Sequence, residues 1–327
     1  TNVSWKSGTR RTSSGNDSCS KRPTATSISP SQSESTAGGT PMARKHRPLA
    51  GWPAARKQAG PLIRNAAGPL ARTPVRPLAG RPVMITGAAS GIGRSLAQRL
   101  SGLGSAVAIA DIDEAGLKET ARTLPGPVLV RVLDVRDAAD QRRFAVEVLQ
   151  WLPSLPDSPP LAAVFNNAGV AVASSVLDAD PDDDEWLRQI NFDGVVNGTR
   201  AFLPILLEQD DGVIVNTSSV FGLLGMPYQS AYCASKFAVR GFTDALRQEL
   251  RGTGVRAVTV HPGGVQTNIA RSARVRKDPA GLGRSQEQMA AEFEQLLRTT
   301  PAKAAEIICR GVDAGKASRF CSGKNAR

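Results

Sequence analysis

The residues of this chain that could do chemistry centre on Tyr232 and Lys236, which lie four positions apart. Positions i and i+4 share one face of a helix, about 5–6 Å apart. A lysine ammonium there is expected to lower the pKa of the phenol, which is ordinarily about 10. Ser219, thirteen residues before the tyrosine, could hydrogen-bond the same substrate oxygen. Phenol, ammonium and hydroxyl together are typical of general acid/base chemistry at an alcohol oxygen.

A glycine-rich turn at 86–93 follows the apolar run at 82–85. A short apolar run predicts a buried parallel strand, and the glycines then let the backbone turn tightly beside a diphosphate. The following helix would offer its N-terminus to the anion. Asp111 ends the next apolar run, where an acid can hydrogen-bond both hydroxyls of an adenosine ribose. A plain β–α connection is the alternative interpretation of the turn by itself.

From about Leu78 onward the chain resembles the short-chain dehydrogenases/reductases. The matching motifs stand in family order: Thr86 to Gly93, Leu133-Asp134-Val135, Asn166-Asn167-Ala168-Gly169, Asn191, Ser219, Tyr232 with Lys236, and Pro262-Gly263 followed by Thr267. The resemblance implies reversible hydride transfer between a nicotinamide and a secondary alcohol or ketone. It also implies an α/β doubly wound parallel sheet, the Rossmann fold, in a homodimer or homotetramer formed through the helices near 184–208 and 230–251.

The resemblance assigns a role to each catalytic position. Tyr232 would be the acid/base, Ser219 would orient the substrate oxygen, and Lys236 would lower the pKa of the tyrosine and bond the nicotinamide ribose. Asn191 would anchor a water that links the lysine to solvent. Ser218 should point away, because adjacent strand residues face opposite sides. The implied cofactor-binding residues are Gly87, Ser90, Gly91, Ile92, Gly93, Asp111, Asp134, Val135, Asn166, Ala168, Gly169, Tyr232, Lys236, Pro262, Gly263, Val265 and Thr267.

The expected cofactor is NAD rather than NADP. Asp111 would repel a 2′-phosphate, and neither Ser90 nor Ile112 supplies the cation that an NADP site usually has. No metal is expected, since the two histidines, His46 and His261, and the four cysteines have no metal-ligand spacing. The alternative function is a non-catalytic dinucleotide sensor or scaffold on the same fold, and the complete set of catalytic residues favours the enzyme.

The elements that must position these residues follow from the alternation of apolar runs with helical segments, which predicts βαβ units around one parallel sheet. We expect strands near 82–86, 105–110, 128–132, 161–166, 212–218 and 255–260, with an edge strand near 318–322. The two longest helices are expected near 184–208 and 230–251. Pro181 and the acidic residues after it indicate a helix start, interpreted as a solvated cap. We therefore expect one catalytic domain, formed by residues 78–327.

The net charge of +12 is a property of the N-terminal part of the chain. Residues 1–80 carry 13 Lys and Arg against two acids, whereas residues 81–327 carry 28 against 27. Residues 1–77 are basic and poor in large apolar side chains, so disorder is predicted. A non-functional extension, a transit peptide and a segment that binds nucleic acid or anionic surfaces all remain open. The catalytic domain is not expected to bind nucleic acid.

No run of 18 apolar residues occurs in the sequence, so no transmembrane helix is expected. The four cysteines show no pattern of a disulfide framework, which fits a reducing compartment such as the cytoplasm.

The substrate is a small-molecule alcohol or carbonyl compound whose identity the sequence leaves open. The apolar segment Leu223 to Tyr228 should line the substrate pocket, and residues 268–284 should form a mobile flap. That flap carries five cations against the lone acid Asp278: Arg271, Arg274, Arg276, Lys277 and Arg284. A solvated loop is the commoner meaning of such a pattern, and a cationic flap that could recruit a carboxylate or a coenzyme A ester is the alternative.

Overall fold

The computed structural model describes residues 75–321 of the chain, and the segment predicted to be a disordered tail lies almost wholly outside these residues. Within residues 75–321 seven strands form one sheet in the order β3-β2-β1-β4-β5-β6-β7. All neighbouring strands pair in parallel. The doubly wound α/β sheet predicted from the sequence is therefore confirmed.

The first and last residues of each strand lie within two residues of the predicted bounds. They are β1 (Val83–Thr86), β2 (Val107–Asp111), β3 (Val128–Val132), β4 (Ala163–Asn166), β5 (Gly212–Thr217), β6 (Val255–Pro262) and β7 (Ser318–Cys321). In β1, Val83 and Ile85 belong to one buried cluster and Met84 to another. Because successive strand residues point to opposite faces, a strand covered on both sides has a continuous apolar sequence.

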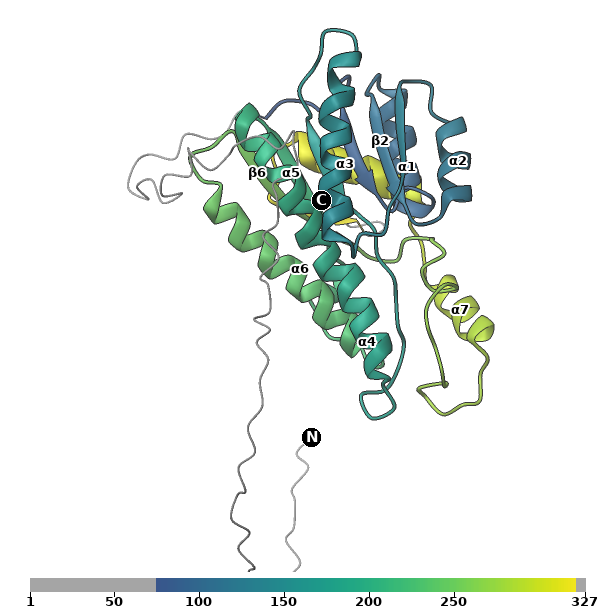
Figure 1. Cartoon of the computed structure of the whole chain (residues 1–327). Helices are drawn as coiled ribbons and strands as arrows, with labels where there is room; N and C mark the ends of the chain where they lie inside the picture. The colour runs from purple at the N-terminus through teal and green to yellow at the C-terminus, as the bar shows by residue number, and fades with distance from the viewer. Residues whose placement is uncertain (1–74, 322–327) are drawn as a thin grey trace, which may run out of the picture. The chain divides into compact units, whose positions relative to one another are not determined.

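Two layers of helices cover the sheet (Figure 1). The first comprises α1 (Gly91–Gly102), α2 (Glu114–Arg122) and α8 (Pro301–Asp313), and the second comprises α3 (Ala138–Trp151), α5 (Gly194–Gln209) and α6 (Ser230–Glu249). Phe144 of α3 meets Phe202 of α5 edge to face, with ring centroids 6.0 Å apart. Each face of the sheet thus has its own apolar core, and the polar residues of interest come where strands end. Among residues 75–321 no helix is long and apolar enough to cross a membrane.

The helix expected near 184–208 is three consecutive pieces. It comprises α4 (Pro181–Arg188), the π-helical turn η3 (Gln189–Asp193) and α5. The predicted start at Pro181 is confirmed, since the side chain of Asp180 accepts a hydrogen bond from the N–H of Asp182 at 2.9 Å. The wider turn η3 contains Asn191, and such π-helical insertions are frequent at functional sites.

The strand order reverses beside β1, which lies between β2 and β4. Ligand sites of open parallel sheets form at the carboxyl ends of the strands next to such a reversal. The glycine turn, the segment after β4 and the residues after β5 and β6 all leave the sheet at these ends. The helix α7 (Gln286–Gln295) lies beyond this edge of the sheet rather than on either of its faces (Figure 1).

Candidate active site

The glycine turn after β1 has the backbone geometry of an anion-binding turn. Gly87 and Gly91 have φ values of +68° and +53°, in the left-handed region that favours glycine. Gly93 packs so tightly that a Cβ atom would lie 2.0 Å from the carbonyl oxygen of Gly87. Ser90 precedes α1 and its side chain makes no capping hydrogen bond. The N-terminus of α1 therefore has no side-chain cap from Ser90, which suits the binding of a diphosphate by its backbone N–H groups.

Asp111 ends β2 beside this turn. Its Oδ2 accepts a hydrogen bond from the N–H of Ala89 at 2.9 Å, and its Oδ1 accepts one from the N–H of Asp113 at 3.1 Å. The next residue, Ile112, is 65% exposed and carries no charge. The carboxylate is thus held by the backbone at the place where the adenosine ribose of a dinucleotide lies in folds of this kind.

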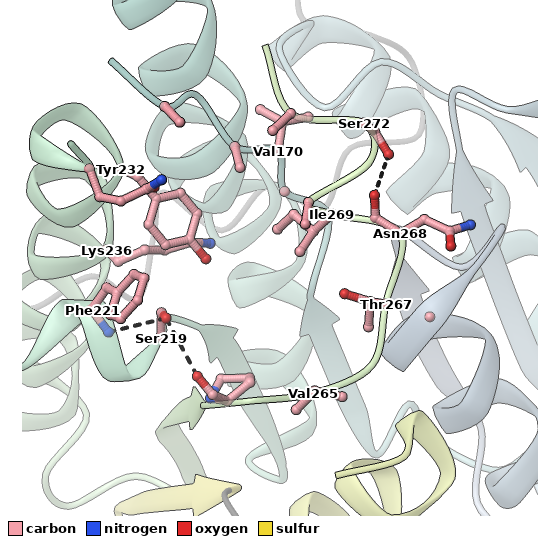
Figure 2. A pocket seen from close by; sticks show the side chains of 18 of the residues that line it. Val170, Ser219, Phe221, Tyr232, Lys236, Val265, Thr267, Asn268, Ile269 and Ser272 are labelled. Carbon is pink, nitrogen blue, oxygen red and sulfur yellow. Dashed lines mark hydrogen bonds between the residues drawn. The ribbon is translucent and has the colours of Figure 1, made fainter. Parts of the chain in front are cut away.

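The groups proposed for acid/base chemistry converge from two elements (Figure 2). Tyr232 and Lys236 lie in the first turns of α6, and Ser219 follows β5. The Nζ of Lys236 lies 5.7 Å from the centroid of the Tyr232 ring and donates a hydrogen bond to the carbonyl oxygen of Thr217 at 3.1 Å. The Oγ of Ser219 accepts a hydrogen bond from the N–H of Phe221 at 3.1 Å. The structure thus brings the phenol, the ammonium and the hydroxyl to one place.

Two neighbouring polar side chains hold the segment that carries Ser219. The hydroxyl of Ser218 donates a hydrogen bond to the carbonyl oxygen of Lys236 at 2.7 Å and is buried, so it points away from the site as expected. The Nδ1 of His261 lies 3.0 Å from the carbonyl oxygen of Ser219. Burial lowers the pKa of this imidazole, which favours its neutral form. His261 therefore has a structural contact beneath the site.

Burial changes the acid/base properties of the tyrosine and the lysine in opposite directions. It raises the pKa of Tyr232 to about 12, and a side-chain hydrogen bond with Ser219 offsets only part of this rise. Burial lowers the pKa of Lys236 to about 8. The net pKa of the phenol is therefore above its ordinary value, and the lowering effect of Lys236 stays a prediction. The loss of hydration is the largest effect on the phenol, which is a proton donor at neutral pH.

Asn191 lies behind the site and is fully buried. Its Oδ1 accepts a hydrogen bond from the N–H of Val170 at 2.8 Å, and its Nδ2 donates to the carbonyl oxygen of the same residue at 3.0 Å. A Cβ atom on Gly169 would come 3.1 Å from this Oδ1 and 3.3 Å from the Nζ of Lys236. The π-helical turn thus brings the amide near the lysine, with the glycine between them.

We expect Lys236→Met to change how stability depends on pH. The pKa of the lysine is about 8 in the folded protein and returns to its ordinary value of 10.5 on unfolding. Between these pH values the unfolded chain binds more protons, so the contribution of this group to the free energy of unfolding rises from pH 8 to pH 10.5, by about 3 kcal/mol in total. The methionine variant should lack this rise.

Urea unfolding gives the free energy of unfolding of each protein at about pH 7 and about pH 10. The rise between these pH values in the variant, subtracted from the rise in the unmutated protein, gives the contribution of Lys236. Lys316→Met, at an exposed lysine, is the matched control and should behave as the unmutated protein. Equal changes in the Lys236→Met variant and the unmutated protein would show that the lysine is hydrated.

One cavity of about 760 Å³ joins the glycine turn to the acid/base groups. Most residues that the sequence proposed for the site contribute to its wall. They are Gly87, Ser90, Gly91, Ile92, Asp111, Asp134, Val135, Ala168, Gly169, Ser219, Tyr232, Lys236, Pro262, Gly263, Val265 and Thr267. A dinucleotide and a substrate would therefore share one continuous space.

Asn166, Gly93 and Asn191 do not line the cavity. The expectation for Asn166 is wrong, because its Nδ2 donates instead to the Oδ1 of Asn216 at 2.8 Å within the core. Adjacent strand residues face opposite sides, so Asn167 reaches the cavity in its place. Gly93 acts through its close contact with the turn rather than as part of the wall.

The substrate end of the cavity differs from its predicted form. Of the segment from Leu223 to Tyr228, the first three residues are absent from the wall and the last three are present. Sequence reasoning missed Trp186 of α4 and several residues of α7, which also line the cavity. The capping box formed by Ser285 and Gln288 is a sequence signature that could have located the start of α7. No local signal indicates that α7 turns apolar side chains toward the site.

The flap predicted to present positive charge has all five of its basic side chains in ion pairs. These pairs are Arg271–Glu294, Arg274–Asp183, Arg276–Asp183, Lys277–Asp178 and Arg284–Asp278. These pairs argue against the alternative of a cationic recruiting surface. Asp183 is not part of a solvated cap either: its side chain is only 4% exposed, and the hydrogen bond from Arg276 holds its pKa below the usual range.

The segment that follows β6 is joined to the opposite wall of the cavity. The guanidinium of Arg274 lies 3.6 Å from the centroid of the Trp186 ring. The backbone N–H of Arg274 donates a hydrogen bond to the carbonyl oxygen of Ala171, and the carbonyl oxygen of Arg274 accepts one from the N–H of Ala173, each at 3.0 Å. Side-chain and backbone contacts thus close the segment over the substrate end.

Comparisons with known proteins agree with this geometry. A family profile described as short chain dehydrogenase matches residues 81–278. SadH of Mycobacterium tuberculosis, named only as an oxidoreductase, is 42% identical over 240 residues, which are 72% of this chain and 83% of the relative. The chain belongs to the short-chain dehydrogenase family and is an oxidoreductase of the Rossmann fold.

Two solved structures show cofactors bound to similar proteins. A short chain dehydrogenase/reductase from Burkholderia phymatum in complex with NAD is 31% identical, with a TM-score of 0.66 over 75% of this chain and 90% of that one. A serine dehydrogenase complexed with NADP+ is 28% identical, with a TM-score of 0.59 over 69% and 87% of the two chains. Proteins of this fold thus accept either nicotinamide cofactor, and the choice depends on local residues.

Proposed function

We propose that this chain is an NAD-dependent oxidoreductase that interconverts a secondary alcohol and a ketone. The observation that carries the proposal is the convergence of Tyr232, Ser219 and Lys236 in the same cavity as the glycine turn. A protonated phenol with a pKa of about 12 beside a fixed hydroxyl is a proton donor for a carbonyl oxygen. A dinucleotide sensor would not need these three groups together.

The residues present fit a nicotinamide dinucleotide. Gly87 and Gly91 adopt left-handed backbone conformations that other residues would strain, and Ser90 makes no capping hydrogen bond at the N-terminus of α1. Asp111 lines the same cavity and would hydrogen-bond the hydroxyls of the adenosine ribose. When bound, the cofactor supplies or accepts the hydride. These contacts would hold its diphosphate and adenosine ribose, and the residues around Gly263 and Thr267 would contact its nicotinamide end.

The chain's own residues then handle the proton and the substrate oxygen. In ketone reduction Tyr232 would donate its phenolic proton to the oxygen, and the Ser219 hydroxyl would hydrogen-bond that oxygen and orient it. Lys236 would stabilise the tyrosinate that forms, since an ammonium nearby favours the charged phenol. Asn191 hydrogen-bonds Val170 and lies near Lys236. It would hold a water that connects this lysine to solvent. In alcohol oxidation the same groups would act in reverse.

We expect the NAD preference to depend on the carboxylate of Asp111. Asp111→Ala should raise the NADP/NAD ratio of kcat/KM, and adding Ile112→Arg should raise it at least about tenfold further, because repulsion is removed and a phosphate ligand is added. Arg136 also lines the cavity, but its guanidinium is committed to Asp134, with Nη2 2.6 Å from Oδ2. It is therefore poorly placed to hold a 2′-phosphate.

NADH and NADPH oxidation rates with one ketone measure the ratio. Glu249→Gln removes an exposed carboxylate at the far end of α6 and is the control for long-range charge effects. An unmutated protein that already uses NADPH better than NADH would refute this role of Asp111.

The expected homodimer or homotetramer stays a proposal. It is supported by an exposed stripe on α6 formed by Ala234, Phe237, Gly241 and Ala245, of which Phe237 is 43% exposed. Positions three and four apart share a helix face, so these small and apolar residues form one seam against which a second copy could pack. Light scattering on the full chain measures the assembly.

A further inference from the structure

The substrate end of the cavity is walled by apolar side chains from several separate segments. Trp186 and Ile190 come from α4 and η3, Phe221 follows Ser219, Ile269 comes from the flap, and Met289 and Phe293 come from α7. The rings of Phe221 and Tyr232 meet edge to face, with centroids 6.1 Å apart. Val170 and Ile269 lie across the cavity from the tyrosine ring (Figure 2). Apolar surface thus continues outward from the reactive oxygen.

The charged side chains that the flap and α7 bring to this end are already neutralised. Of the charged residues that line the cavity, only Arg284 and Glu292 lie in the flap and α7, and they pair with each other at 2.7 Å. Arg284 also pairs with Asp278 at 2.9 Å. The other flap cations are held by carboxylates as described above. Within residues 75–321 the charged side chains that the flap and α7 contribute to the cavity wall are therefore paired, and the cation beside the reactive oxygen is Lys236 of the acid/base group.

We infer that the site takes an uncharged alcohol or ketone whose reacting carbon carries a large apolar body. This inference rests on the proposed function and deepens it by naming the substrate class. Burying apolar surface against this wall is favourable in proportion to area. A charged group carried into the same space would lose its hydration without a partner, which is unfavourable. The ion pairs of the flap hold the apolar wall in place and are not contacts for the substrate.

The test is a series of 2-alkanones from about four to about ten carbons, with NADH oxidation as one readout. The second readout is tryptophan fluorescence in the presence of NADH, because Trp186 lies in the cavity wall. Trp186→Phe should abolish the change of fluorescence on ketone binding, which would assign that change to Trp186. We expect kcat/KM to rise up to about fourfold per added methylene, corresponding to about 0.8 kcal/mol for each buried CH₂. For an analogue with a terminal carboxylate, kcat/KM should be at least about tenfold lower than for the ketone of equal length.

A matched pair of variants tests the wall directly. Met289→Arg places a cation inside the cavity. It should raise the ratio of kcat/KM for the carboxylate analogue to kcat/KM for the ketone, which is the substrate preference, at least about tenfold. Ala291→Arg adds the same charge at an exposed position of α7 outside the wall, and should leave the preference unchanged. Met289→Leu keeps the wall apolar and should retain the preference of the unmutated protein.

The outcomes separate the substrate class from the proposed function. Ketones that bind with the expected dependence on length and charge but are never reduced would overturn the function and leave the class standing. Reduction without a rise along the series, or a preference for the carboxylate, would overturn the class and leave the function standing. Absence of both binding and reduction across the series would also overturn the class.

Discussion

Tyr232→Phe is expected to lower kcat by about 10²–10⁴-fold, the contribution that general acid/base catalysis typically makes. The dissociation constant of NADH should change little, because the substitution removes only the phenolic oxygen and keeps the ring against Phe221. Steady-state ketone reduction gives kcat, and titration of NADH fluorescence gives the dissociation constant. The two readouts together separate the chemical step from the binding of the cofactor.

Tyr228 provides the matched control, since the chain has only two tyrosines. It also lines the cavity and is 43% exposed, but it lies outside the convergence of phenol, ammonium and hydroxyl. Tyr228→Phe should keep kcat close to that of the unmutated protein. Turnover of Tyr232→Phe above about a tenth of the unmutated rate would remove the acid/base role from this residue.

Gly93→Ala is expected to weaken NADH binding by at least about tenfold, because the new methyl group cannot fit beside the glycine turn. Its carbon would lie 2.0 Å from the carbonyl oxygen of Gly87 and 2.7 Å from the carbonyl carbon. Both are backbone atoms, so relief requires the turn itself to move. A displaced turn no longer presents its backbone and the start of α1 to the diphosphate.

Gly102→Ala lies in the same helix and tests the effect of alanine without the clash, since a Cβ atom there meets nothing within 4 Å. Alanine favours a helix over glycine by about 1 kcal/mol, so this variant should be at least as stable as the unmutated protein and bind NADH normally. Circular dichroism confirms that both variants fold. A folded Gly93→Ala variant with unchanged NADH affinity would contradict the role given to the turn.

The sequence by itself determined the sheet, the glycine turn and the convergence of the acid/base groups. These rest on signals carried by neighbouring residues. Continuous apolar runs indicate buried parallel strands, glycines indicate left-handed backbone, and the spacing of Tyr232 and Lys236 indicates one face of a helix. Because the carboxyl ends of parallel strands meet at one edge, the order of the motifs also placed most of the cavity wall.

The tertiary structure alone decided the properties that depend on residues far apart in the chain. Asp183 meets Arg274 across 91 positions, so no local pattern could show that the flap cations are neutralised. The same holds for Asn166, whose side chain turns into the core rather than the cavity. The pKa values of Tyr232 and Lys236 depend on how completely other elements exclude water from them, which raises one and lowers the other. Burial is a result of packing, and packing joins elements that the sequence keeps apart.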